Sequence, residues 1–302
     1  MALEQNDILS AMKPRVISGL AGLTILALFL VTAVSLAFVA IQSTNQDLVV
    51  TFLDVGQGDA TLIETPSGTQ VLIDGGKPRS VGRPLSRQLP FYDRSLDVVI
   101  GTHADSDHIG GLVDVLADYR VGRVGVPSLP NDTADFRAFQ QAAATEAQVD
   151  LAEVQQLSRG DVMHLDEGVY LLTLFPLVEH QPSDLNDSST VFKLIYGETS
   201  FMLTGDTGTS IEKYLAGIDG QLLDSDVLKI GHHGSDTSSS EVFLSAVSPD
   251  VAVISAGADN SYGHPHQSVL NRLSLLEIET VCTCDEGDIQ FRSNGKKVIY
   301  IK

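Results

Sequence analysis

The sequence predicts an α/β protein in which two β-sheets are covered by helices on their outer sides. Short β-branched runs bounded by Gly, Pro or Asp, such as "LVVTFLDV", "DATLIET" and "TQVLIDGG", predict a meander of strands after residue 47. Strands and helices alternate in the last third of the chain, and the hairpin "DIQFRSNGKKVIYIK" closes it. We therefore expect one α/β domain over residues 47–302.

The elements follow from local patterns. "SLDVVIGTH" is typical of a buried strand, and "GGLVDVLADY" after it has helical spacing. "NDTADFRAFQQAAATEAQ" predicts a helix capped by Asn131, Asp132 or Thr133. "TVFKLIYGETSFMLTGD" predicts a hairpin that turns at Gly197–Glu198. Four of the remaining segments are expected to be strands: "GVYLLTLFP", "SDVLKIGHH", "DVAVISAG" and "ETVCTC". The segments between them are expected to be helices: "SIEKYL" near 210–215, "SSEVFLSAV" and "HQSVLNRLSLLE".

The composition restricts the class of function. The 302 residues carry a formal net charge of −20, with 39 acids against 19 bases. This balance argues against a protein that grips nucleic acid by a broad basic surface. It is compatible with a catalytic domain whose site must supply its own positive charge, and a bound metal would do so.

The N-terminal segment differs in kind from the rest. Residues 16–41 contain no charged side chain, and the stretch exceeds the roughly 20 residues needed to span a bilayer. Lys13 and Arg15 precede it, and no base follows until Lys77. The positive-inside rule then predicts a cytoplasmic tail over 1–15, a single transmembrane anchor and an extracytoplasmic domain at the cell membrane. The alternative is a signal peptide cleaved after "SLA", although the apolar stretch is long for one.

Cys282 and Cys284 are the two cysteines of the chain. Two residues apart on a strand, they would lie on the same face as a pair of small side chains. A disulfide between such close neighbours is geometrically awkward, and two thiols are too few for a zinc knuckle. We therefore expect two packed thiols.

The segment "THADSDHIGG" predicts a metal site. It offers His103, Asp105, Asp107 and His108 at the end of an apolar strand, on an expected loop before a helix. Imidazole and carboxylate together suit Zn, Mn, Fe or Co. One cation could not use all four side chains, but two cations a few ångströms apart could share them. Gly110 and Gly111 would let the backbone fold tightly beneath them.

Further polar clusters support this interpretation against that of a solvated loop. "MLTGD" ends a strand at Asp206, "KIGHHGS" ends another at His232 and His233, and "YGHPH" places His264 and His266 after a third. Six of the eight histidines of the chain thus follow predicted strands. For the aspartates of "LDVGQGDA" and "LIDGG", a role in forming turns is the stronger expectation. These are Asp54, Asp59 and Asp74.

Six ordered blocks together resemble the metallo-β-lactamase-fold hydrolase domain of ComEC-type competence proteins. They are "LDVGQGDATLIETPSGTQVLIDGG", "THADSDHIGGL", "FMLTGD", "DVLKIGHHGSDTSSS", "VAVISAGADNSYGHPH" and "DEGDIQFRSNG". The resemblance covers about residues 48–302. It implies a four-layered αβ/βα sandwich with metals in a cleft at the edge of the two sheets.

The chain departs from the wider superfamily at two positions. The superfamily carries HxHxDH, whereas this chain, like its competence relatives, has HxDxDH. Asp105 thus replaces an imidazole with a harder oxygen donor, which shifts the preference from Zn towards Mn or Mg. The superfamily also usually offers a histidine before the bridging aspartate, where this chain has Asn186 and Ser189, while His180 nearby fits no motif.

Competence channel proteins also have many membrane spans, whereas one is expected in this chain, so the function of the channel is not carried over to it by analogy.

The expected function is that of a metal-dependent extracytoplasmic hydrolase, a phosphodiesterase or nuclease with two divalent ions, Mn or Zn before Mg. The ions would lower the pKa of water towards neutrality, and a histidine would contact phosphate or protonate the leaving oxygen. The alternatives are hydrolysis of a cell-envelope ester or a lactam, and a non-hydrolytic DNA-uptake accessory. Protein partners are not predicted. The expected metal ligands are His103, Asp105, Asp107, His108, Asp206 and His233, and the expected catalytic residues are Asp107, His232, His264 and His266.

Overall fold

A computed structural model describes residues 21–35, 47–177 and 184–301. The chain separates into two compact units, Met1–Gln46 and Asp47–Lys302. In the first unit, residues 21–35 are helical and exposed. The predicted anchor over 16–41 lies partly outside the described residues, and within them no helix is long and apolar enough to cross a membrane.

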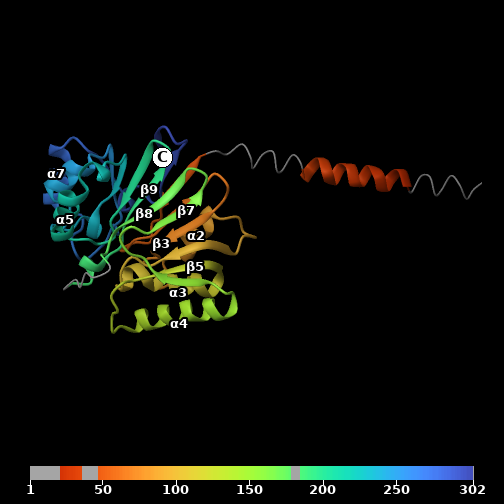
Figure 1. The fold of residues 1–302 in the computed structure, drawn as a ribbon, viewed down its shortest axis with the longest axis horizontal. Helices are drawn as coiled ribbons and strands as arrows, with labels where there is room; N and C mark the ends of the chain where they lie inside the picture. The colour runs from red at the N-terminus through yellow and green to blue at the C-terminus, as the bar shows by residue number, and fades with distance from the viewer. Residues whose placement is uncertain (1–20, 36–46, 178–183, 302) are drawn as a thin grey trace, which may run out of the picture. The chain divides into compact units, whose positions relative to one another are not determined.

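The second unit contains two sheets with helices on their outer faces (Figure 1). One sheet has eight strands in the order β15-β14-β1-β2-β3-β4-β5-β6. Its strands are β1 (Leu48–Phe52), β2 (Thr61–Glu64), β3 (Gln70–Ile73), β4 (Ser95–Ile100), β5 (Arg120–Val126), β6 (Glu153–Gln156), β14 (Ile289–Ser293) and β15 (Val298–Ile301).

The other sheet has seven strands in the order β13-β12-β11-β10-β9-β8-β7. They are β7 (Val162–Asp166), β8 (Val169–Phe175), β9 (Val191–Tyr196), β10 (Thr199–Leu203), β11 (Val227–Lys229), β12 (Val251–Ile254) and β13 (Glu279–Cys282). The helices are α2 (Gly82–Gln88), α3 (Ser106–Asp118), α4 (Ala134–Val149), α5 (Thr209–Asp219), α6 (Glu241–Val247), α7 (Gln267–Leu275) and α8 (Thr283–Glu286). Three short 3₁₀ turns are η1 (Asn186–Ser188), η2 (Gly220–Leu223) and η3 (Gly231–Gly234).

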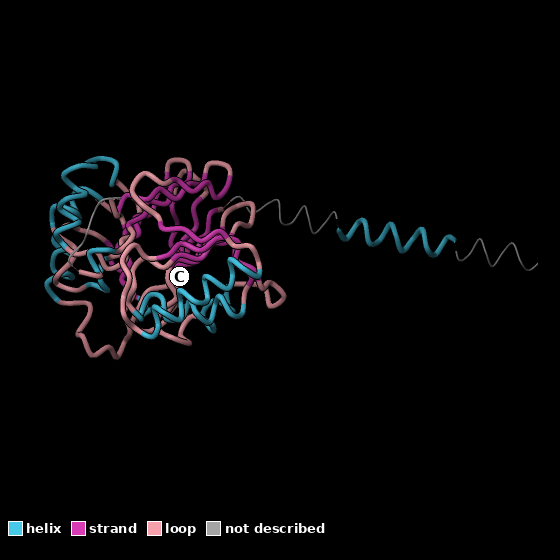
Figure 2. Tube along the Cα trace, turned by 60° about the horizontal axis from the view of Figure 1, so that its bottom comes forward, coloured by secondary structure: helices cyan, strands magenta, loops and turns pink. Residues whose placement is uncertain are grey.

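Three apolar layers hold these four layers of structure together. The central one lies between the sheets and includes Phe52, Phe201 and Phe291. A second layer joins the eight-stranded sheet to α3 and α4, and a third joins the seven-stranded sheet to α5, α6 and α7. Figure 2 shows the strands gathered between the two groups of helices. The predicted two-sheet α/β architecture is confirmed.

Most predicted elements are present. The hairpin of β9 and β10 pairs Tyr196 with Thr199, as expected for a turn at Gly197–Glu198. Thr133 is the N-cap of α4, and its side chain accepts a hydrogen bond from the Phe136 amide. Sequence patterns did not predict α2, β6 or β7, because these elements are short and β6 is largely exposed.

Two expectations about local structure are wrong. Cys282 and Cys284 form a disulfide with a Cα–Cα distance of 5.1 Å. The bond is feasible because β13 ends at Cys282 and the chain turns at once into α8, so the two side chains do not lie side by side on a strand. The second error concerns "HADSDH", expected as a loop, because α3 already begins at Ser106 inside it.

The architecture brings the polar strand ends together. Strands β3, β4 and β5 are parallel, and so are β10, β11, β12 and β13. Parallel strands place their carboxyl ends at one edge of a sheet, where sites form in α/β proteins. The motif at 103–108 follows β4, Asp206 follows β10, and the two histidines at 232 and 233 follow β11.

Candidate metal centre

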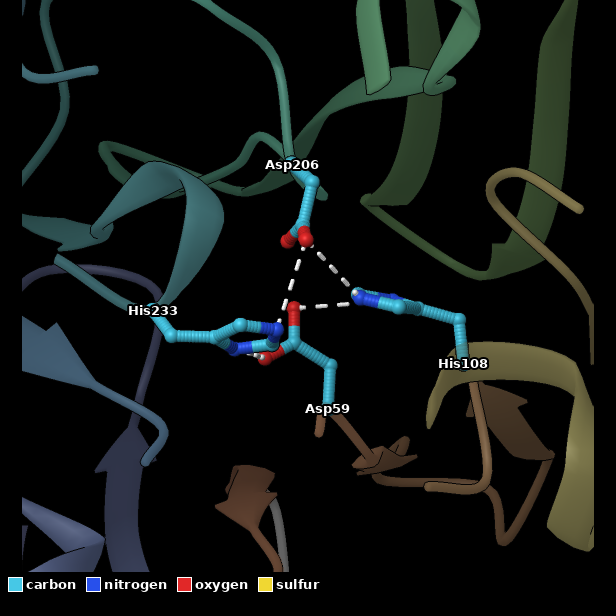
Figure 3. A group of neighbouring side chains, drawn as sticks. All are labelled: Asp59, His108, Asp206 and His233. Carbon is cyan, nitrogen blue, oxygen red and sulfur yellow. Dashed lines mark ion pairs between the residues drawn. The ribbon is translucent and has the colours of Figure 1, made fainter. Parts of the chain in front are cut away.

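Asp59, His108, Asp206 and His233 lie at the centre of the predicted site (Figure 3). All four are buried, and one ligand atom from each lies within 4.8 Å of the others. Oδ2 of Asp206 is 3.2 Å from Nε2 of His108 and 3.3 Å from Nε2 of His233. One carboxylate oxygen therefore lies between an imidazole nitrogen from α3 and another from η3, which suits a carboxylate that bridges two cations.

The three buried histidines are held by their Nδ1 atoms. Nδ1 of His108 donates to Oδ2 of Asp74 at 2.8 Å, and Nδ1 of His233 donates to the carbonyl of Ser255 at 2.9 Å. The hydroxyl of Thr102 donates to Asp74, so it can accept from Nδ1 of His103 at 3.1 Å. These contacts fix each ring with Nδ1 protonated.

The Nε2 atoms are left for another partner. In His103, His108 and His233 the Nε2 atom is buried and has no hydrogen-bond partner among the described residues. Oδ1 of Asp206 is also buried and has no hydrogen-bond partner among these residues. Histidines that donate from one nitrogen to a carboxylate or carbonyl and leave the other free are typical of metal ligands. The residues present therefore fit divalent cations.

The other side chains of the segment at 103–108 surround the central group of four residues. Oδ2 of Asp105 is 3.6 Å from Nε2 of His103, whose ring lies 4.1 Å from that of His108 between centroids. Oδ2 of Asp107 is 3.7 Å from Nε2 of His233. The side chains of Asp105 and Asp107 are 35% and 24% exposed, so the group is accessible to solvent on this side.

Close backbone packing positions the motif. A Cβ atom on Gly111 would lie 2.0 Å from the Gly75 carbonyl oxygen, which agrees with the expected need for glycine beneath the motif. Gly58 has a φ of +135°, and a Cβ there would lie 2.3 Å from the carbonyl oxygen of Asp107. Side chains at either position would separate the loops that carry Asp59, Asp74 and the motif.

Asp59 and Asp74 correct the expectation that both serve only turns. Asp74 is 1% exposed and accepts hydrogen bonds from the Thr102 amide, the Thr102 hydroxyl and His108. Asp59 is 5% exposed and belongs to the central group. Asp54 behaves as expected, because it accepts a hydrogen bond from the Gly56 amide two residues on.

Lys229 is a further member of the site that the sequence did not indicate. It ends β11 in "VLK", is 3% exposed, and forms an ion pair with Oδ2 of Asp59. Its Nζ also donates to the Gly205 carbonyl at 3.0 Å and lies 3.8 Å from Oδ1 of Asp206. A buried ammonium group thus balances part of the negative charge of the group.

The two neighbouring histidines have different surroundings. His233 is 2% exposed and faces Asp206, whereas His232 is half-buried and turns towards Asn186 and Thr237. The geometry therefore favours His233 as the ligand. Asn186 lies 3.4 Å from His232, and the hydroxyl of Ser189 accepts from the Asp206 amide. These two residues, which occupy the segment where a histidine is usual, contact the site without offering an imidazole.

His264 and His266 also differ from each other. The His264 ring centroid lies 5.7 Å from that of His232 and 6.2 Å from that of His233, so it borders the group. Both ring nitrogens of His266 face backbone groups, the amide of Asp236 and the carbonyl of Tyr262. The structure thus gives His266 a bracing position instead of the expected free nitrogen for phosphate. His180 lies outside the described residues.

The charges of the central group are strongly coupled. Burial alone would raise the pKa of Asp59, but Lys229 and His233 outweigh it and lower the pKa to about 2. Burial opposes ionisation of Asp206 too, yet His108 and His233 hold its pKa well below the usual value. Burial would lower the pKa of His233, but Asp206 and Asp59 raise it to about 9. The pKa of His108 is likewise raised, against burial, by Asp206 and Asp74.

These shifts predict that metal binding releases protons. Below about pH 9 His233 holds a proton in the metal-free protein, and a cation must displace it. We expect calorimetric heats of Mn binding near pH 7 to depend on the ionisation enthalpy of the buffer, and the affinity to increase with pH until His233 is neutral. Heats that are the same in all buffers would contradict the assignment of His233 and His108 as ligands.

In this protein two α/β layers face each other, and histidines and aspartates lie beyond the carboxyl ends of their strands. This arrangement defines a class of metal-dependent αβ/βα sandwich proteins. The sequence profile of the metallo-beta-lactamase superfamily matches residues 53–258. The chain belongs to this superfamily.

Its similar proteins include competence proteins. It is 34% identical to ComE operon protein 3 of Bacillus subtilis (strain 168) over 267 residues, which are 82% of this chain and 33% of that protein. It is 34% identical to Recombination protein 2 of Haemophilus influenzae over 242 residues, 79% of this chain and 28% of that protein. The chain thus spans about a third of the length of the relatives it matches.

Among solved structures, a CmlA beta-hydroxylase E377D mutant is similar with a TM-score of 0.53 at 16% identity, over 82% of this chain and 54% of that one. At this identity the likeness shows the fold alone. The resemblance of the six sequence blocks to the competence proteins is confirmed.

Proposed function

We propose that this protein is a phosphodiesterase that uses two divalent metal ions and cleaves nucleic acid or a related phosphodiester. The observation that carries the proposal is the set of three fixed histidines whose buried Nε2 atoms make no hydrogen bond within the described residues, two of which, in His108 and His233, face the shared carboxylate of Asp206. His103, Asp105 and Asp206 would hold one ion, and Asp107, His108, Asp206 and His233 the other. Bound divalent ions would activate water and neutralise phosphate charge.

A basic segment beside the group supports an anionic substrate. Residues 75–87 carry four bases and no acid in a chain of net charge −20. The segment starts directly after Asp74, and the amide of Gly76 donates to the carbonyl of Asp59. Lys77, Arg79 and Arg83 are exposed and form no ion pair within the described part of the chain. Free cations next to a metal centre attract phosphate groups.

His264 would take part in this proposal only as a neutral hydrogen-bonding group. Burial and the neighbouring His233 and His232 lower its pKa to about 4. Its imidazole is therefore neutral near pH 7, and it can accept or donate a hydrogen bond but adds no positive charge. His232, whose pKa burial also lowers, would contact the substrate in the same neutral form.

The test is a metal-dependent activity screen of the purified full chain. Single-stranded DNA, RNA and model phosphodiesters would each be incubated with Mn, Zn or Mg after chelation of the protein. We expect cleavage of at least one phosphodiester with Mn, and none with the chelated protein. No cleavage with any metal, or cleavage of only a lactam or a carboxylic ester, would refute the proposal.

Asp105 should influence the choice of metal. An oxygen donor in place of an imidazole disfavours Zn relative to Mn, so we expect the wild-type protein to be more active with Mn. Asp105→His should move the preference towards Zn. The measurement is activity with each metal after chelation and reconstitution. An unchanged preference would mean that Asp105 does not contact a metal ion.

We also propose that residues 16–41 anchor the protein in the cell membrane with the catalytic domain outside the cytoplasm. Lys13 and Arg15 before the apolar stretch support this orientation. A reporter fused after Lys302 should be exported and remain with the membrane fraction. Release of a soluble mature protein would instead indicate a cleaved signal peptide.

A second candidate function is that of a DNA-uptake accessory that binds DNA without cleaving it. The similarity to Competence protein ComA of Neisseria gonorrhoeae, at 32% identity over 82% of this chain, supports this alternative. The same screen separates the two functions, since the accessory would bind DNA but produce no fragments with any metal.

A further inference from the structure

An exposed aromatic residue lies beside the metal centre. Tyr262 is 59% exposed, although it lies in the loop between β12 and α7 that also carries His264. The rings of Tyr262 and His264 are nearly parallel, with 21° between their planes and 5.7 Å between their centroids. His264 in turn lies 6.2 Å from His233 of the central group. These two stacked rings, called the aromatic shelf below, thus lead outwards from His233 of the metal centre.

The loop holds this shelf in a fixed position. The side chain of Asn260 accepts from the His264 amide at 2.9 Å and donates to the carbonyls of His264 and Gly257. The carbonyl of Tyr262 contacts Nε2 of His266, and Nδ1 of His266 accepts from the Asp236 amide. An exposed aromatic ring costs little conformational entropy on binding when its backbone is already fixed.

The loop also packs against other walls of the site. The Gly257 amide donates to the side chain of Gln57, and a Cβ on Gly257 would lie 2.9 Å from the Gln57 amide nitrogen. Gln57 belongs to the loop of Asp59, whose carbonyl accepts from Gly76 at the start of the basic segment. Three loops therefore lie in a row, in which the loop of Asp59 separates the basic segment from the aromatic shelf.

We propose that Tyr262 is a base-stacking residue, and that it makes the site select phosphodiesters that carry a nucleobase. This inference rests on the proposed phosphodiesterase function. A nucleotide held with its phosphate at the metal centre would place its base on the ring of Tyr262, while the next phosphates meet Lys77 and Arg79. Tyr262 is a positioning residue in this arrangement, because it does not touch the reacting atoms.

The geometry favours a flat base over a quaternary ammonium group such as choline. Both ligands bind aromatic faces, but cations of this kind are held by cages of several rings around them. Tyr262 and His264 are nearly parallel and stacked, so they present the exposed ring of Tyr262 instead of a cage. Base–aromatic stacking is worth about 1–3 kcal/mol per base and tolerates any sequence.

The test compares two oligomers of equal length and charge that differ only in their bases. The probes are a fluorescein-labelled phosphorothioate deoxythymidine 12-mer, which resists cleavage, and the same 12-mer with abasic residues, bound by the Mn-loaded full chain and measured by anisotropy. We expect the wild type to prefer the thymidine oligomer. Tyr262→Ala should weaken its binding by about tenfold, which corresponds to about 1.4 kcal/mol, and leave the abasic oligomer unchanged. Tyr262→Phe should retain the preference.

Tyr92 provides a matched control. It is 67% exposed but lies before β4, at the opposite end of the strand from the motif at 103–108. Tyr92→Ala should change neither binding curve. Because the chain has seven tyrosines and no tryptophan, quenching of tyrosine fluorescence by the thymidine oligomer gives a second readout, and it should decrease in Tyr262→Phe and Tyr262→Ala.

The outcomes separate this inference from the proposed function. The stacking role would be overturned if Tyr262→Ala lost the same affinity for both oligomers, or if the wild type showed no base preference. It would also be overturned if glycerophosphocholine displaced the oligomer in a Tyr262-dependent manner. Cleavage of thymidine and abasic oligomers at equal rates would overturn it as well, while the phosphodiesterase function would stand. Base-dependent binding without cleavage under any metal would refute the phosphodiesterase and leave the stacking role intact.

Discussion

Asp206→Asn should abolish most metal binding and reduce phosphodiester cleavage by at least about a hundredfold, by analogy with the loss of other metal-site groups. The substitution preserves the size of the side chain but removes the charge that faces both His108 and His233. Without the negative charge of the Asp206 carboxylate, the repulsion between two bound cations would be less well compensated. The measurement is the metal content of the purified variant together with its rate in the activity screen.

Asp250→Asn is the matched control for this experiment. Asp250 is exposed and precedes β12, at the other end of that strand from the loop of His264. Its substitution should change neither metal content nor rate. DNA binding by Asp206→Asn should persist in part, because phosphate contacts outside the group remain. If the wild type bound no metal and cleaved nothing, while Asp206→Asn abolished DNA binding, the accessory function would be the better description.

Lys229→Met should destabilise the metal-free protein by about 3–5 kcal/mol, because it leaves a buried carboxylate without its partner. Asp59 is 5% exposed, and Lys229 is the largest favourable influence on its ionisation. A bound cation would replace part of the lost positive charge. We therefore expect urea unfolding to show a large loss of stability in EDTA and a smaller loss with Mn.

Lys193 offers a control of similar burial away from the metal centre. Its side chain is 8% exposed and donates to the carbonyl of Leu222 at 2.9 Å. Lys193→Met should be destabilising to the same extent with and without Mn. If the loss in Lys229→Met were also independent of the metal, Lys229 would not compensate charge at the centre.

The sequence predicted those parts of the site that follow a simple local pattern. An apolar run that ends in a cluster of histidine and aspartate is unusual, so the segment at 103–108, Asp206 and His233 could be found without the structure. Asp59 and Asp74 could not, because an aspartate beside glycine is most often a turn residue. Their function depends on the packing of loops that are distant along the chain, which only the fold determines.

Lys229 and Tyr262 were missed for different reasons. A lysine within an apolar strand carries no signal of its partner, and its role is visible only once Asp59 is placed beside it. Tyr262 lies in a loop without periodicity, so its exposure could not be inferred. The architecture itself was predictable because alternating strands and helices require two covered sheets. The short strands β6 and β7 were not, since runs of 4 and 5 residues are too short to establish a period.

The pairing of β1 with β14 has a consequence for synthesis of the protein. Leu48–Phe52 pairs on one side with Thr61–Glu64, which follows closely, and on the other with Ile289–Ser293, which is made much later. Until those residues leave the ribosome, the first strand has an open edge with the apolar sequence "LVVTF". An unpaired apolar edge of this kind can recruit other chains. The nascent domain therefore stays vulnerable to aggregation until Ile289–Ser293 is made, and slowing elongation over the codons between these two strands should lower the yield of folded protein.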